Sequence, residues 1–137
     1  MANTLYDFAR QRFLEAQINW MTDTIKVFLV STSAYTPQTA VHQYLSDIPP
    51  SGRIAGPVTL TAKATTGGAA DAADCTFTAV SGATINAIVI AKDTGTEATS
   101  PLIAYIDTAT GLPITPNGGD ITPRSEAANK GAFLAAA

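Results

Sequence analysis

The segment Asp93-Thr94-Gly95-Thr96 is the one stretch of the chain with the form of a catalytic motif. Small aspartic proteases place such an Asp-Thr-Gly-Thr segment at a dimer interface, where two close carboxylates share one proton. Lys92 directly precedes the aspartate, and a neighbouring cation favours the ionised carboxylate over a shared proton. Asp and Gly also supply the backbone geometry of turns. We therefore predict that the segment is a polar turn between two strands and that the protein is not an enzyme.

The chain has a single histidine, His42, and a single cysteine, Cys75. Any Ser-His-Asp or Cys-His arrangement would have to use that one imidazole, and a metal site would lack a second histidine. We predict a His42 satisfied by its surroundings and a Cys75 packed as a small apolar side chain. A lone cysteine cannot form an intramolecular disulfide, which fits a chain made in a reducing cytoplasm.

Metal and phosphate sites are also poorly supported by the sequence. Asp71 and Asp74 could hold calcium, but they lack the spacing of an EF-hand loop with its glutamate at the twelfth position. The pairs Gly67-Gly68 and Gly118-Gly119 lack the Gly-x-x-x-x-Gly-Lys pattern of a phosphate loop. We predict turns at both glycine pairs, with no metal, no cofactor and no catalytic residue.

Composition limits the classes of partner. The 137 residues are 46% hydrophobic but only 14% charged, against a usual charged fraction of about 25%. The net charge is −3, and the Lys and Arg residues are spread singly from Arg10 to Lys130. That pattern argues against nucleic acid and against an anionic membrane surface. Residues 1–13 carry Asp7 and two arginines where a signal peptide needs an apolar stretch, so we expect a soluble protein that is not secreted.

The elements that would position these residues form one domain over residues 1–137. Thr4 and Asp7 have the spacing of a capping box, and they predict an amphipathic helix over residues 4–17. One face of this helix would carry the apolar residues Leu5, Phe8, Ala9, Phe13 and Ala16.

Residues 24–122 have the pattern of an antiparallel β-sandwich, and Ile25–Val30 is the strongest strand in the sequence. Residues 39–45 could close one or two helical turns, and residues 69–73 are interpreted as a loop. Further strands are predicted at 53–63, 74–80, 84–91, 100–107 and 112–115. Residues 123–137 are predicted to form a flexible or weakly helical tail.

The surface is the remaining candidate for function. A sandwich whose solvent face is Thr, Ala, Ser and Gly has little charge to desolvate and little side-chain entropy to lose on contact. The candidate interface residues are the aromatic residues near the amino end, Tyr6, Phe8, Phe13 and Trp20. Phe8 and Phe13 also fit a role in pinning the helix to the sheet, so Tyr6 and Trp20, which lie off that stripe, are favoured as contacts.

Most of residues 1–122 resembles a group of small virion structural proteins of tailed bacteriophages. The resemblance is carried by stretches without catalytic content, namely Met1-Ala2-Asn3-Thr4-Leu5-Tyr6-Asp7, Ile18-Asn19-Trp20, residues 24–30, 44–49, 71–74, 76–80 and 100–113, and Asp120-Ile121-Thr122. Within this group the best-fitting role is that of a capsid decoration, or cement, protein, similar to the one on the Bordetella podophage head.

The resemblance implies a mainly β, jelly-roll-like domain on the outer surface of the capsid, made in the host cytoplasm. It further implies a homodimer that binds the major capsid protein and bridges neighbouring capsomers. The chain departs from the family after Thr122, where Pro123-Arg124-Ser125 stands in place of a last strand with a Trp-Asp-Asn-Gly turn.

A carbohydrate-binding module of a tail fibre or baseplate is the alternative. Sugar sites expose aromatic platforms beside carboxylates. Trp20, Tyr35 and Tyr44, with Asp47 nearby in sequence, fit that description.

Overall fold

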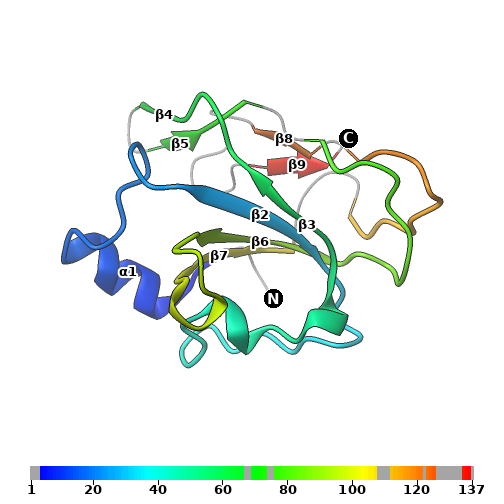
Figure 1. The fold of residues 1–137 in the computed structure, drawn as a ribbon, viewed down its shortest axis with the longest axis horizontal. Helices are drawn as coiled ribbons and strands as arrows, with labels where there is room; N and C mark the ends of the chain where they lie inside the picture. The colour runs from blue at the N-terminus through cyan, green and yellow to red at the C-terminus, as the bar shows by residue number, and fades with distance from the viewer. Residues whose placement is uncertain are drawn as a thin grey trace.

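The main sheet is antiparallel and has five strands in the order β1-β7-β6-β2-β3 (Figure 1). It is seen in a computed structural model that describes residues 4–66, 69–73, 76–107, 112–121, 123–125 and 134–136. The strands are β1 (Thr4–Leu5), β2 (Ile25–Val30), β3 (Arg53–Thr59), β6 (Ala87–Lys92) and β7 (Leu102–Ile106). The prediction of a mainly β protein is confirmed, whereas this strand order does not confirm a jelly-roll topology.

Strand β2 has the predicted bounds and lies between β6 and β3. Val27 is paired with Ile90 on one side and with Val58 on the other. The strands predicted at 53–63, 84–91 and 100–107 are present with different ends. In place of the strands predicted at 74–80 and 112–115, the described residues form the single bridges Phe77↔Ile121 and Ile85↔Ile114.

Two short strand pairs lie outside the main sheet, and both were missed by the sequence analysis. They are β4 (Ala64–Thr66) with β5 (Ala69–Asp71), and β8 (Pro123–Ser125) with β9 (Leu134–Ala136). Ala69–Asp71 were predicted to be part of a loop but form a strand. In the tail, which was predicted to be flexible or weakly helical, Pro123–Ser125 and Leu134–Ala136 are strands, so a helix is wrong for these residues. Alanine has a low strand propensity, and cross-strand pairing overrides it here. Pro123 is tolerated because it is the first residue of its strand.

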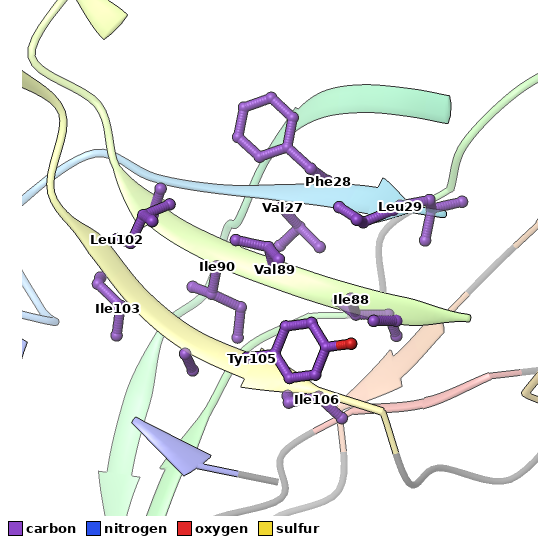
Figure 2. Packing of buried hydrophobic residues seen from close by; sticks show 14 of the residues in the cluster. Val27, Phe28, Leu29, Ile88, Val89, Ile90, Leu102, Ile103, Tyr105 and Ile106 are labelled. Carbon is purple, nitrogen blue, oxygen red and sulfur yellow. The ribbon is translucent and has the colours of Figure 1, made fainter. Parts of the chain in front are cut away.

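The three inner strands are buried on both faces. Successive side chains of a strand point to opposite sides of a sheet, yet Ile88, Val89 and Ile90 of β6 are each no more than 1% exposed. Figure 2 shows the same arrangement in β2, where Phe28 projects to the opposite side from Val27. Both faces of the sheet are therefore covered by other parts of the chain.

The helix is shorter than predicted. α1 runs from Asp7 to Leu14, because Thr4 and Leu5 are paired with β7 as β1. Tyr6 occupies the N-cap position and makes no side-chain capping bond, so the predicted capping box is absent.

The helix ends in a Schellman arrangement, in which the N–H of Gln17 donates to Arg12 O at 2.8 Å and the N–H of Ala16 donates to Phe13 O at 3.2 Å. Ala16 adopts the left-handed conformation that such an ending requires, with φ 59°. Ala9 is the one fully buried residue of α1. The predicted amphipathic stripe is therefore not confirmed.

Three short 3₁₀ helices lie in the connections, at Leu45–Asp47, Pro50–Gly52 and Glu97–Thr99. The helical turns predicted over 39–45 are reduced to a turn in which the N–H groups of Val41 and His42 both donate to Gln38 O. Within the described ranges, no helix has the length and apolar character needed to cross a membrane.

Candidate binding surface

The Asp93 segment forms a turn between β6 and β7, as predicted. Its carboxylate accepts the N–H of Gly95 at 2.9 Å and forms an ion pair with Lys26 at 3.1 Å. The Gly95 N–H and the Lys26 ammonium hold the pKa of Asp93 below its usual range. Asp93 is therefore a paired turn residue.

A pocket of about 420 Å³ lies beside this turn, between β2, β3 and the 3₁₀ helices. Phe28, Leu45 and Pro57 are among the apolar residues of its wall, and five charged residues also line it: Lys26, Arg53, Lys92, Asp93 and Glu97. Arg53 binds Glu97 through two contacts of 2.7 and 3.1 Å, and it also donates to Ile48 O at 2.8 Å. The other charged groups in the wall are paired in Lys26–Asp93 and Lys92–Asp23. The pocket therefore presents no unpaired charge to a ligand.

His42 ends a chain of hydrogen bonds that leads into the core. The hydroxyls of Tyr6 and Tyr35 lie 2.8 Å apart, and the Tyr35 hydroxyl lies 2.9 Å from His42 Nδ1. Nδ1 also accepts the N–H of Gln38 at 3.3 Å, so Nδ1 is unprotonated. Tyr35 therefore donates to His42, and Tyr6 donates to Tyr35. The prediction of a satisfied His42 is confirmed.

This chain of hydrogen bonds predicts the effect of removing its middle hydroxyl, that of Tyr35. Tyr35→Phe deprives the Tyr6 hydroxyl of its acceptor, and Tyr6 is 0% exposed. We expect a loss of about 1–3 kcal/mol in the free energy of unfolding, the cost of an unsatisfied buried donor. Urea unfolding of Tyr35→Phe and of Tyr6→Phe measures this. The Tyr6 variant removes the terminal donor and leaves the Tyr35–His42 bond, so an equal or larger loss in that variant would contradict the assigned donor order.

The exposure of the predicted interface aromatic residues differs from what the sequence analysis predicted. Tyr6 is 0% exposed and Trp20 is 9% exposed, so the two residues favoured as contacts lie in the core. Tyr6 is drawn inward because its N–H donates to Ile103 O of β7 at 3.0 Å. Phe8 is partly buried, whereas Phe13, which was expected to pin the helix, is 36% exposed.

The aromatic platform of the carbohydrate-binding alternative is not formed either. Tyr35 is only 2% exposed, and with Trp20 also buried, two of its three rings present almost no face to solvent. Tyr44 is partly exposed, and its ring faces the guanidinium of Arg12 at 4.9 Å.

Exposed large apolar side chains come from one part of the chain. Within the described residues they are Leu5, Phe13, Leu14, Met21 and Val41, and all lie between residues 5 and 41. Leu14 is 89% exposed and Val41 is 62% exposed. We call Phe13 and Leu14, which both lie on α1, the α1 surface. The helix lies at one end of the main sheet, at the left of Figure 1, and its first residue, Asp7, donates its N–H to Thr39 O at 2.9 Å, which holds it against the 38–42 turn.

The α1 surface was only partly predictable. Phe13 was among the candidate interface residues, but Leu14 was not. A signal was present in Leu14, which is adjacent to Phe13 and cannot share its helix face. An apolar residue that lies outside the predicted apolar face of the helix indicates a surface that the chain itself does not bury.

Arg12 lies on the same helix and is held firmly. Its Nη2 donates to the Tyr44 hydroxyl at 2.9 Å and to Gln43 Oε1 at 3.2 Å. The guanidinium also lies 5.9 Å from the ring centroid of Phe8, beside its contact with Tyr44. Its Nη1 is buried and has no hydrogen-bond partner among the described residues.

Asp47 fixes the segment that holds Arg12. Its carboxylate accepts the N–H of Gln43 at 2.8 Å and that of Tyr44 at 3.1 Å. Burial by itself raises the pKa of Asp47, but these two N–H donors outweigh it and hold the pKa below its ordinary value. Asp47 is therefore a structural carboxylate that orders residues 43 and 44.

Of the two residues considered as calcium ligands, Asp71 and Asp74, only the first lies within the described residues. No group of three or more His, Cys, Asp or Glu side chains lies together in the part of the chain that the structure describes. Asp71 ends β5, whereas Asp74 and Cys75 fall outside the described residues.

Comparison of the chain with models of known protein families finds no match. Comparison with curated proteins finds no significant match either.

Proposed function

We propose that this protein is a capsid decoration protein of a tailed bacteriophage. It binds the major capsid protein on the outside of the mature head, acts as a homodimer, and bridges neighbouring capsomers. The stretches of residues 1–122 that resemble small virion proteins point to this class. The jelly-roll-like arrangement belongs to the same proposal, with the five-stranded sheet as one of its two layers.

The α1 surface is the structural observation that supports a binding role. The adjacent side chains of Phe13 and Leu14 are 36% and 89% exposed, and neighbouring exposed apolar groups favour protein contacts. The helix that carries Phe13 and Leu14 buries only Ala9 fully, so its outer side is available to a partner. We assign this surface to the contact with the capsid.

Stabilisation of the mature head follows from selective binding. A dimer that spans a joint between capsomers fits only when the capsomers have their mature spacing. It therefore stabilises that state relative to the unexpanded one, as any ligand does that binds one of two states. The low fraction of charged residues, 14%, keeps the desolvation cost of each contact small. Many modest contacts over one head then add through multivalency.

Purified protein added to mature heads stripped of their decoration tests this proposal. We expect saturable co-sedimentation with the heads and a rise of several degrees in the temperature at which they release DNA, because binding stabilises the state that is bound. Unexpanded heads are the matched control and are expected to bind at least tenfold more weakly. Cryo-electron microscopy of the virion would overturn the proposal if it placed the protein only at the tail.

A further inference from the structure

We propose that Arg12 is the binding site for a carboxylate of an acidic side chain on the capsid surface. This inference rests on the proposed function, because it names a chemical group of the capsid that the helix α1 recognises through Arg12. Its basis is a guanidinium that is held in place and has no carboxylate of the described residues within ion-pair distance.

Charge pairing sets Arg12 apart from Arg10 and Arg53, the other two arginines whose side chains the structure describes. Arg10 pairs with Asp7 at 2.7 Å, and Arg53 pairs with Glu97 at 2.7 Å. Lys26 and Lys92 also have carboxylate partners. Arg12 has none among the described residues, although its Nη1 is buried. A buried charged donor without an acceptor is costly, so an incoming carboxylate that accepts from it gains more than it would at an exposed arginine.

The guanidinium is already oriented for a ligand. Tyr44 and Gln43 fix Nη2, and the rings of Phe8 and Tyr44 lie against the group at 5.9 and 4.9 Å. Binding therefore requires little further ordering of a long side chain, which is a main cost of binding through arginine. Arginine presents parallel N–H donors that match the two oxygens of a carboxylate.

Two hollows give access to this group. One, of about 240 Å³, lies toward Phe8, Gln11 and Glu15; the other, of about 390 Å³, lies toward Tyr44, Thr94 and Thr99. Gln17 is exposed and borders both hollows. In the second hollow the hydroxyls of Thr94 and Thr99 are already bonded to Thr96 O and to each other, so Arg12 supplies the donors for a ligand there. The other cation of this hollow, Lys92, is already paired with Asp23, so the site matches a single negative charge.

A protein carboxylate is favoured over a free anion because of the neighbouring residues. The half-buried ring of Phe8 lies 5.9 Å from the guanidinium and also lines the first hollow, so it offers an apolar contact beside the arginine. Interfaces concentrate their binding energy in such combinations of arginine with apolar anchors. The expected partner surface therefore has an acidic residue next to an apolar depression.

Paired glutamine variants test the inference. Arg12→Gln and Arg10→Gln make the same change in net charge on the same helix, but only the first removes the unpaired guanidinium. We expect Arg12→Gln to weaken binding to stripped heads at least tenfold and Arg10→Gln to weaken it less than twofold. Arg12→Lys, which keeps the charge without the paired donors, is expected to show most of the loss. Thermal unfolding of each free variant verifies that it is folded.

A second measurement uses the free protein and does not depend on the capsid. Acetate is titrated while the ¹⁵Nε resonances of the arginines are followed by NMR, with chloride as the control anion. A selective, saturable shift of Arg12 supports the carboxylate site even if the wild-type protein fails to bind heads, and that failure would then count against the proposed function alone. Equal head binding by the Arg12→Gln and Arg10→Gln variants would overturn the inference. It would also be overturned if glucuronate bound far more tightly than acetate in an Arg12-dependent way, because the occupant would then be a sugar acid.

Discussion

Gly56→Ala is expected to lower the free energy of unfolding by more than about 3 kcal/mol, at the upper end of single-substitution effects. Gly56 has φ +111°, a conformation that side chains other than glycine rarely adopt, and a Cβ there would lie 2.7 Å from Val27 O and 3.2 Å from Phe28 Cα. These are backbone atoms of β2, the strand that pairs with both β3 and β6. They cannot retreat without disturbing the middle of the sheet, so the overlap adds to the conformational cost.

Gly95→Ala is the matched control for this prediction. Gly95 also has a positive φ, +89°, but a Cβ there would meet nothing within 4 Å. The expected cost is therefore that of the backbone conformation alone, about 1–2 kcal/mol. Urea unfolding of both variants measures the difference. Equal losses would show that β2 accommodates the added carbon and that the contact with Val27 does not limit residue 56.

The central strands were predictable because their signal is local. Ile25–Val30 is an apolar and β-branched run, and it forms β2 with those same bounds. The sequence pattern also indicated β6 and β7. Their ends shifted because they depend on partners: β6 begins at Ala87, where its pairing with Val30 begins. Ile85, two residues earlier, instead pairs with Ile114.

The amino-terminal helix was overextended for a similar reason. The spacing of Leu5 and Phe8 is helical, but Leu5 pairs with Ala104 across the sheet. The strand partner is about a hundred residues away in sequence, and helical periodicity carries no information about it. That one pairing removes the first turn of the predicted helix and draws Tyr6 into the core.

The candidate site was hardest to predict because it depends on distant contacts. Arg12 is held by Gln43 and Tyr44, which follow it by 31 and 32 residues. Nothing in the sequence around Arg12 distinguishes it from Arg10, which forms an i,i+3 ion pair on the same helix. The exposed apolar residues carried a weak local signal in the Phe13-Leu14 pair, and the turn at Asp93 carried a strong one.

Removing the apolar side chains of α1 is expected to abolish binding to the capsid. Leu14→Ser should weaken binding to stripped heads about thirtyfold, the loss of about 2 kcal/mol that marks an interface hot spot. The double variant Phe13→Ser, Leu14→Ser should weaken it more than about a hundredfold. Because Leu14 is 89% exposed in the free protein, its loss should leave the free energy of unfolding nearly unchanged. Co-sedimentation over a range of protein concentrations measures the binding.

Arg10→Gln on the same helix is the control, because it changes an exposed side chain and leaves Phe13 and Leu14 in place. Wild-type affinity in the double variant would exclude the α1 surface as the capsid contact. The mass of each variant in solution, from analytical ultracentrifugation, separates the two contacts that the proposal requires. If the double variant loses head binding but stays dimeric, α1 meets the capsid. If it becomes monomeric, α1 joins the two copies, and the capsid contact then lies on another face of the dimer.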